Sequence, residues 1–309
     1  MIKLGALGDV VLAFAAMRRI REGHPEAEIT ALTTPSFADL IAASPYVDRV
    51  EDDGRPRGVR ATWRMIERLR AARYERVYDL QTSTRSSSYF HLLRPDPPEW
   101  SGIARGCALP HRNPERDLMH TLERQADQLK DAGVWPDAPT APGSAPPPDL
   151  SWMIEAGSEA AFGATPPYAL LVPGGSPHRM DKRWPAGRYE RLAIDLARRG
   201  LQPVVIGGPA EAALAREIGE RAPQALDLIG RTSIPDLAAL GAAAALAVGN
   251  DTGPLHVIAA AGAPTLALFS EASDPALTAP RGPQVEVLRR ASLEDLSVEE
   301  VQQAAEDLL

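Results

Sequence analysis

The chain alternates two kinds of segment, and one proline-rich stretch interrupts the alternation. Short apolar runs that fit β-strands are followed by segments whose apolar residues recur at helical spacing. This order predicts parallel sheets covered by helices. Residues 136–148, PDAPTAPGSAPPP, hold six prolines and fit neither helix nor sheet. We therefore predict an N-terminal Rossmann-like domain over 1–135, a linker over 136–150 and a C-terminal Rossmann-like domain with a terminal helix over 151–309.

The expected elements can be placed by their patterns. In the first part we expect strands over 1–7, 27–32 and 76–80 and helices over 10–21, 35–43, 60–73 and 116–133. In the second part we expect strands over 168–173, 203–207, 226–229, 246–248 and 264–269 and helices over 185–199, 210–221, 234–243, 255–261 and 293–309. Two doubly wound units facing each other predict a ligand cleft at the carboxyl ends of their strands.

Composition excludes several classes of protein. A chain of 309 residues that is 44% hydrophobic is neither disordered nor too short for two cores. It has no apolar stretch of the length that a membrane-spanning helix needs, and its start does not resemble a signal peptide. The single cysteine, Cys107, excludes a disulfide framework and a cysteine zinc site. We expect a cytoplasmic protein.

Charge is distributed unevenly. Residues 1–150 hold 20 Lys/Arg and 21 Asp/Glu, a balance of −1, whereas residues 151–309 hold 13 and 20, a balance of −7. Eight arginines between Arg55 and Arg76 face only Glu67 and Glu75. A local basic cluster in an acidic protein favours a specific anionic partner over nucleic acid. A solvated helix face is the alternative interpretation.

The first candidate loop is Gly5-Ala6-Leu7-Gly8-Asp9, between an expected strand and a helix. Its glycine spacing does not fit the dinucleotide fingerprint, which argues against a dehydrogenase. Asp9 can cap the helix, or it can act as a general base in a cleft.

Two further loops follow strands of the second part. The loop over 173–185 brings glycines, Ser176 and Lys182, which suit a phosphate group. Lys182 is one of only three lysines, although it can also be an ordinary exposed lysine. Glu211, after the expected strand over 203–207, can accept two ribose hydroxyls or simply favour a helix N-terminus.

The loop GNDTGPLH over 249–256 joins a strand to a helix N-terminus. Thr252 and Gly253 offer a hydroxyl and backbone donors, so this loop predicts an anion site. Asp251 can cap the helix or orient its neighbours, and His256 can be structural or functional.

These loops together resemble glycosyltransferase family 9, the heptosyltransferases of lipopolysaccharide core assembly. The resemblance is carried by LGALGDVV, DLQTSTRSS at 79–87, DKRWP at 181–185, GGPAE at 207–211 and NDTGPLHVIAAAGAPTLALF at 250–269. It implies an α/β GT-B fold, an ADP-sugar donor in the C-terminal domain and an anionic lipid-linked glycan acceptor at the N-terminal domain. It also implies inversion at the anomeric carbon and peripheral contact with the inner face of the cytoplasmic membrane.

The resemblance also assigns roles to single residues. Asp9 matches the catalytic base, Lys182 the lysine that meets the donor phosphates, and Glu211 the acid on the ribose. Asp251, Thr252 and Gly253 match the diphosphate loop, with His256 after it. Acceptor contacts are expected from Arg55, Arg57, Arg60, Arg85 and His120. No cofactor and no metal are expected, and Asp52-Asp53 is more typical of a turn.

The chain departs from the family in two places. Ser270–Ser273 replaces the usual Gly-Pro-Thr stretch near the expected donor sugar, and the first strand is shorter than usual. Alternatives therefore stay open: a UDP- or GDP-sugar transferase, an epimerase of the same fold, or a non-catalytic nucleotide-binding homologue. The identity of the sugar, the acceptor hydroxyl, the oligomeric state and the natural start are not fixed by the sequence.

Overall fold

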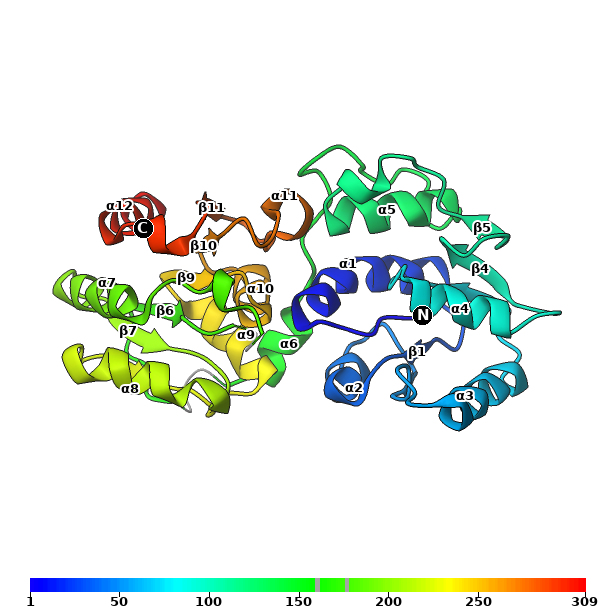
Figure 1. The fold of residues 1–309 in the computed structure, drawn as a ribbon, viewed down its shortest axis with the longest axis horizontal. Helices are drawn as coiled ribbons and strands as arrows, with labels where there is room; N and C mark the ends of the chain where they lie inside the picture. Colours follow the sequence, from blue (N-terminus) through cyan, green and yellow to red (C-terminus); the bar gives the residue numbers. More distant parts are fainter. Residues whose placement is uncertain (159–161, 176–177) are drawn as a thin grey trace. The chain divides into compact units, whose positions relative to one another are not determined.

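The computed structural model describes residues 1–158, 162–175 and 178–309 and divides into two compact units, Met1–Pro146 and Pro147–Leu309. Figure 1 shows α1 to α5 in the first unit and α7 to α12 in the second. The division falls at Pro146–Pro147, inside the proline-rich stretch. Part of that stretch packs on the first unit, because Ala145 is buried against Leu12 and Leu122.

The first unit consists of short strands between longer helices. Its elements are α1 (Leu7–Gly23), β1 (Thr30–Leu32), α2 (Pro35–Ala42), β2 (Arg49–Glu51), α3 (Val59–Ala71), β3 (Arg76–Tyr78), α4 (Thr84–Leu92), β4 (Glu99–Gly102), β5 (Leu109–Pro110), the 3-10 helix η1 (Arg116–Leu118) and α5 (Thr121–Asp131). All strand pairs are parallel, β1 with β2 and β3 with β4 and β5. Ile2 forms a parallel bridge both to Leu32 and to Asp79, so it joins the two groups of strands.

The second unit contains one six-stranded parallel sheet. Its elements are α6 (Ser151–Ala156), β6 (Tyr168–Val172), η3 (Met180–Lys182), α7 (Ala186–Arg198), β7 (Gln202–Val205), η4 (Pro209–Glu211), α8 (Ala212–Arg221), β8 (Leu226–Asp227), α9 (Ile234–Ala243), β9 (Leu246–Asn250), α10 (Gly253–Ala260), β10 (Thr265–Phe269), α11 (Pro275–Thr278), β11 (Val285–Arg289), η5 (Leu293–Asp295) and α12 (Val298–Leu308). The strand order is β11-β10-β9-β6-β7-β8, with every pair parallel. This is the order of a doubly wound sheet.

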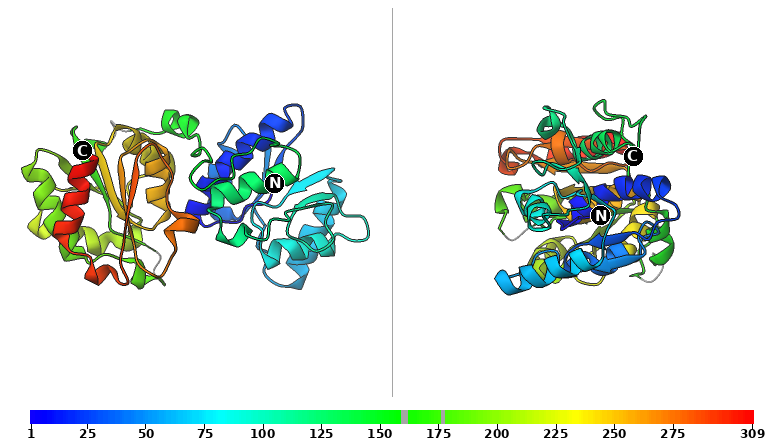
Figure 2. Two further views of the ribbon diagram at one scale, coloured as in Figure 1. Left: turned by 90° about the horizontal axis from the view of Figure 1, so that it is seen from above. Right: turned by 90° about the vertical axis from the view of Figure 1, so that its right-hand side faces the viewer.

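Burial explains why the second sheet is stable. The strands β6, β9 and β10 are buried at every position, as expected for a parallel sheet covered on both faces. Helices α7 and α12 lie on one face, where Tyr189, Leu192 and Val301 join the core, and α9 and α10 lie together on the other (Figures 1 and 2). The α/β fold class expected from the sequence is confirmed.

Three expected elements are wrong in detail. The strand expected over 1–7 is reduced to the bridge at Ile2, because α1 already begins at Leu7. The helix expected over 116–133 is broken at Met119, whose backbone is extended, and a new helix starts with His120 as its cap. The tail helix is likewise split, because Ser297 and Glu300 form a capping box that begins α12.

Several elements were not predicted. These are β2, α4, β4, β5, α6, α11 and β11. Most are short or carry mixed polar and apolar residues, so their periodicity is weak. In the described residues, no helix combines the length and the apolar character needed to cross a bilayer.

Candidate functional site

In the second sheet, the order in which successive strands are added changes direction between β6 and β9. Strands β7 and β8 extend the sheet from β6 on one side, and β10 and β11 extend it from β9 on the other. The loops after β6 and β9 therefore leave the sheet in opposite directions at its carboxyl edge, the switch point at which doubly wound sheets bind ligands in a crevice. Lys182 follows β6, and Asp251 and Thr252 follow β9.

Asn250 holds these two loops together. Its side chain is completely buried, and its Nδ2 donates to the carbonyl oxygens of Pro173 at 2.8 Å and Gly174 at 3.1 Å. Its Oδ1 accepts from the Trp184 backbone N–H at 3.0 Å and from the Tyr189 hydroxyl at 3.0 Å. Every hydrogen-bonding position of this amide is used, so the loop after β6 is tied at both ends to the last residue of β9. We did not identify Asn250 from the sequence.

Asp251 is the centre of a polar cluster in this crevice. Its Oδ2 accepts from Lys182 Nζ at 2.6 Å and from the Ser273 hydroxyl at 2.7 Å. Its Oδ1 lies 3.9 Å from His256 Nε2. Burial disfavours the charged carboxylate, but the interactions with His256, Lys182 and Ser273 outweigh burial and hold the pKa of Asp251 well below its usual value. The lysine is thereby paired with a carboxylate that is ionised at neutral pH.

Polar atoms with no protein partner surround this cluster. Among the described residues, Thr252 Oγ1, His256 Nδ1 and Arg183 Nε are buried without a hydrogen bond. Gly175 lies beside two of these residues: a Cβ at this position would be 3.5 Å from Thr252 Cγ2 and 3.6 Å from Arg183 Nε. Buried groups without partners are costly, so they indicate a place that a polar ligand or water would fill.

The N-terminus of α10 adds a favourable field for an anion. Thr252 is its N-cap residue but makes no side-chain capping hydrogen bond, and Gly253 is the first helical residue. Pro254 has no N–H and the Leu255 N–H donates to the Thr252 carbonyl oxygen at 3.1 Å, so the Gly253 N–H and the helix dipole are what this terminus offers a phosphate group. The donors here are one ammonium group, the Gly253 N–H and a hydroxyl without a partner among the described residues, and this set fits a diphosphate.

Glu211 lies at the neighbouring loop, after β7. Its Oε1 accepts from the Gly175 N–H at 2.8 Å and its Oε2 from the Gly208 N–H at 2.6 Å. A Cβ on Gly174 would come within 2.1 Å of Glu211 Oε1, so only glycine allows this close approach. Ser176, which we expected to contact a phosphate group of the donor, lies outside the described residues.

In the first unit, Asp9 occupies the third position of α1. Its Oδ2 accepts from the backbone N–H of Ala6 at 3.1 Å, so the carboxylate caps the helix. It also faces two cationic side chains: burial lowers the pKa of Lys3 and of Arg124, and the charge of Asp9 opposes both shifts. Asp9 is therefore both a cap and the acidic member of a small charged group.

A pocket of about 810 Å³ lies beside this loop. Its lining includes Gly5, Ala6, Arg55, Arg57 and Arg85. Three of the arginines that we expected to bind an acceptor thus come together next to the loop that carries Asp9. Arg60 does not line this pocket and lies on the exposed side of α3.

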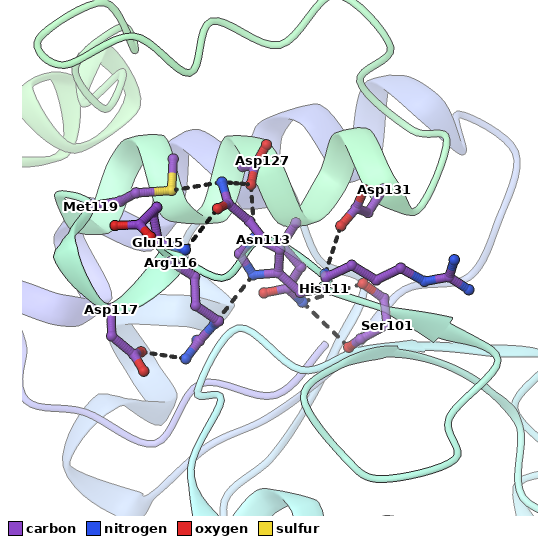
Figure 3. A network of polar contacts seen from close by, with 11 residues as sticks. Ser101, His111, Asn113, Glu115, Arg116, Asp117, Met119, Asp127 and Asp131 are labelled. Carbon is purple, nitrogen blue, oxygen red and sulfur yellow. Dashed lines mark hydrogen bonds and ion pairs between the residues drawn. The ribbon is translucent and has the colours of Figure 1, made fainter.

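His120 has a structural role in this fold. Its Nδ1 accepts from the Leu122 N–H at 3.2 Å and lies 3.3 Å from Glu123 Oε2, with both side chains almost fully buried. The preceding loop is fixed to α5 by His111 and Asn113, which contact Asp127 Oδ2 at 2.9 Å and 2.7 Å (Figure 3).

Asp79 belongs to the motif DLQTSTRSS at 79–87, but we did not predict it as a site residue. It is buried, and its Oδ1 accepts from the N–H groups of Gln81 and Thr82, whereas its Oδ2 has no hydrogen-bond partner among the described residues. Burial raises the pKa of Asp79 to about 6, against the hydrogen bonds that it accepts. Gln81 in turn accepts from the Leu4 N–H at 2.8 Å, so this motif positions the start of the Gly5–Asp9 loop.

Two α/β units with parallel strands, the second with a doubly wound sheet, fit the GT-B fold. The family model "Glycosyltransferase family 9 (heptosyltransferase)" matches residues 62–306, and the chain belongs to this family. The expected enzyme class, a glycosyltransferase, is confirmed.

Individual relatives agree with this assignment. The chain is 26% identical to lipopolysaccharide heptosyltransferase 2 of Salmonella typhimurium, over 92% of this chain and 85% of the relative. Among solved structures, it resembles E. coli ADP-heptose heptosyltransferase II with a TM-score of 0.79 and 23% identity, over 99% of this chain and 97% of that one. It resembles the E. coli heptosyltransferase WaaC with ADP with a TM-score of 0.75 and 21% identity, over 100% and 98%.

Proposed function

We propose that this protein transfers heptose from an ADP-sugar to a lipopolysaccharide core or related cell-envelope acceptor, with inversion at the anomeric carbon. The observation that carries the proposal is the Lys182–Asp251 pair. It precedes the start of α10, where the Thr252 hydroxyl has no partner in the part of the chain that the structure describes. The names of the relatives, several of them lipopolysaccharide heptosyltransferases, support the choice of sugar and acceptor.

The donor would bind in the crevice of the second unit. Its diphosphate would meet Lys182, the Thr252 hydroxyl and the Gly253 N–H. Asp251 keeps Lys182 in place; it also accepts from the Ser273 hydroxyl, and His256 Nε2 lies 3.9 Å from its other oxygen. Each oxygen of Glu211 accepts one backbone N–H, which leaves lone pairs for the ribose hydroxyls.

The acceptor would bind at the first unit. Arg55, Arg57 and Arg85 line one pocket and would meet phosphate groups of an anionic acceptor. Asp9 would take the proton of the attacking hydroxyl as its oxygen bonds to the anomeric carbon. The bond from that carbon to the diphosphate breaks in the same step, and one attack from the opposite side inverts the centre.

Charge stabilisation completes the mechanism. The leaving ADP gains negative charge, which Lys182 and the N-terminal dipole of α10 would stabilise. A positioned general base contributes roughly 10²–10⁴-fold to such a reaction.

Isothermal titration with ADP, UDP and GDP tests the donor assignment. We expect a preference for ADP. Lys182→Gln, which can still donate to Asp251 but carries no charge, should bind ADP at least about tenfold more weakly. Lys130→Gln, at an exposed lysine on α5, is the matched control and should bind normally. A preference for UDP or GDP would keep the enzyme class and overturn the ADP-sugar assignment.

A further inference from the structure

We infer that the exposed side of α3 docks on an anionic lipid bilayer. The surface consists of Val59, Arg60, Trp63 and Arg64, and we call it the α3 surface. Val59 and Trp63 are 73% and 47% exposed, which is unusual for side chains of this size. They lie one helical turn apart, as do Arg60 and Arg64, so the two pairs form adjacent stripes on the same part of the helix.

The opposite side of α3 already provides its attachment to the core. Met65 and Ile66 are completely buried in the hydrophobic cluster of the first unit, and Leu69 packs against that cluster. The exposed apolar residues are therefore not needed to hold the helix. Figure 1 shows α3 at the periphery of the first unit, in light blue.

The arginines of this region divide into two groups. Arg68 is bound by Glu51 and Asp53, and Arg70 donates to the backbone oxygens of Leu92 and Arg94. Arg60 and Arg64, in contrast, have no hydrogen bond or ion pair in the portion of the chain that the structure describes. The first half of α3 thus keeps its positive charge free beside its exposed apolar side chains.

This combination fits a bilayer surface better than it fits other occupants. Tryptophan has an apolar body and a polar N–H and prefers the level of the lipid headgroups, where arginine can meet lipid phosphates. A second copy of the chain would bring the same positive charges face to face, which is unfavourable. The only acidic residue of α3 is Glu67, so the field of this surface stays positive.

The docking deepens the proposed function, because it places the enzyme at the surface that would carry a lipid-linked acceptor. Only the biological purpose of the docking rests on the proposed function; the binding to a bilayer does not. Vesicles without acceptor can therefore test it whether or not the proposed reaction is correct.

The test is binding of the whole protein to vesicles of phosphatidylcholine with about 30% phosphatidylglycerol, compared with phosphatidylcholine alone. We expect binding to the anionic vesicles that weakens with added salt. Arg60→Ser/Arg64→Ser should weaken it by about 25-fold, about fivefold for each charge near the surface. Arg198→Ser/Arg216→Ser removes the same charge from exposed positions on α7 and α8 and should have little effect. Equal loss in both double variants, or no binding to either vesicle, would overturn the inference.

Tryptophan fluorescence gives a second, local measurement. Trp63 is the exposed one of the five tryptophans, so brominated lipids should quench it on binding. Quenching should disappear in Trp63→Phe, and Trp63→Ser should bind vesicles roughly tenfold more weakly. Because Trp63 is outside the proposed donor and acceptor sites, Trp63→Ser should keep its transfer rate with a water-soluble acceptor. Unchanged quenching in Trp63→Phe would contradict docking through α3.

Discussion

Lys182 Nζ and Asp251 Oδ2 lie 2.6 Å apart, although the two residues are separated by 69 positions in the chain. They meet because one follows β6 and the other follows β9, the two strands at which the sheet changes direction. Both side chains are mostly buried, at 18% and 9% exposure, so solvent screens their interaction only weakly. The fold thus holds the Lys182 ammonium group in a fixed position at the place where a doubly wound sheet binds its ligand.

The Ser273 hydroxyl should stabilise the contact between Lys182 and Asp251. Ser273→Ala removes one hydrogen bond to Asp251 Oδ2, and we expect ADP affinity to fall by about fivefold because Lys182 is held less firmly. Ser273→Thr keeps the hydroxyl and should bind ADP normally.

Ser273→Ala should also make the protein less stable at acid pH. The pKa of Asp251 is lowered in the folded protein, so its contribution to stability is present above the unfolded pKa of 3.8 and is lost as pH falls. In Ser273→Ala this pKa moves up, and acid unfolding should begin at a higher pH than in the wild type. Identical acid unfolding of both proteins would show that the Ser273 hydroxyl does not support Asp251.

Thr252 offers a test that separates ligand binding from folding. Among the described residues, its hydroxyl is buried without a partner and makes no capping hydrogen bond. Thr252→Val keeps the shape of the side chain, so the melting temperature without ligand should be unchanged or higher. The affinity for ADP should fall by about fivefold. A lower melting temperature with unchanged ADP affinity would indicate a structural hydroxyl instead.

Asp79 should make the protein less stable as pH rises from 4 to 6. Its folded pKa of about 6 lies above the unfolded value of 3.8, so the folded state binds the extra proton in this range. Relative to Asp79→Asn, the free energy of unfolding of the wild type should decrease by about 2 kcal/mol over this interval. Urea unfolding of both proteins at several pH values measures this difference, and parallel curves would show that Asp79 does not titrate there.

The sequence was sufficient for the fold class and for the loops of the second unit. Strong apolar runs such as residues 168–172 and 265–269 became fully buried strands, and the polar residues after them met at one edge of the sheet. Parallel order determines this convergence, so the loop positions could be inferred without coordinates.

What the sequence did not reveal were contacts between distant residues. Asn250 follows an apolar run and gives no periodic signal, yet it ties together two loops and two aromatic residues. Ser273 was recognised only as part of a departure from the family pattern, whereas its hydroxyl contacts Asp251. The exposure of Trp63 was not predicted either, because it lies away from the side of α3 on which Met65 and Ile66 are buried.

The most direct test of the central claim is sugar transfer by an Asp9→Asn variant. Asparagine keeps an oxygen that can accept from the Ala6 N–H, so the cap of α1 is preserved while the basic carboxylate is lost. Release of ADP from ADP-heptose with a heptose-deficient lipopolysaccharide core acceptor should fall by roughly 10²–10⁴-fold, with ADP binding unchanged. Transfer at the wild-type rate by Asp9→Asn would contradict the account, because Asp9 would then be only the cap of its helix.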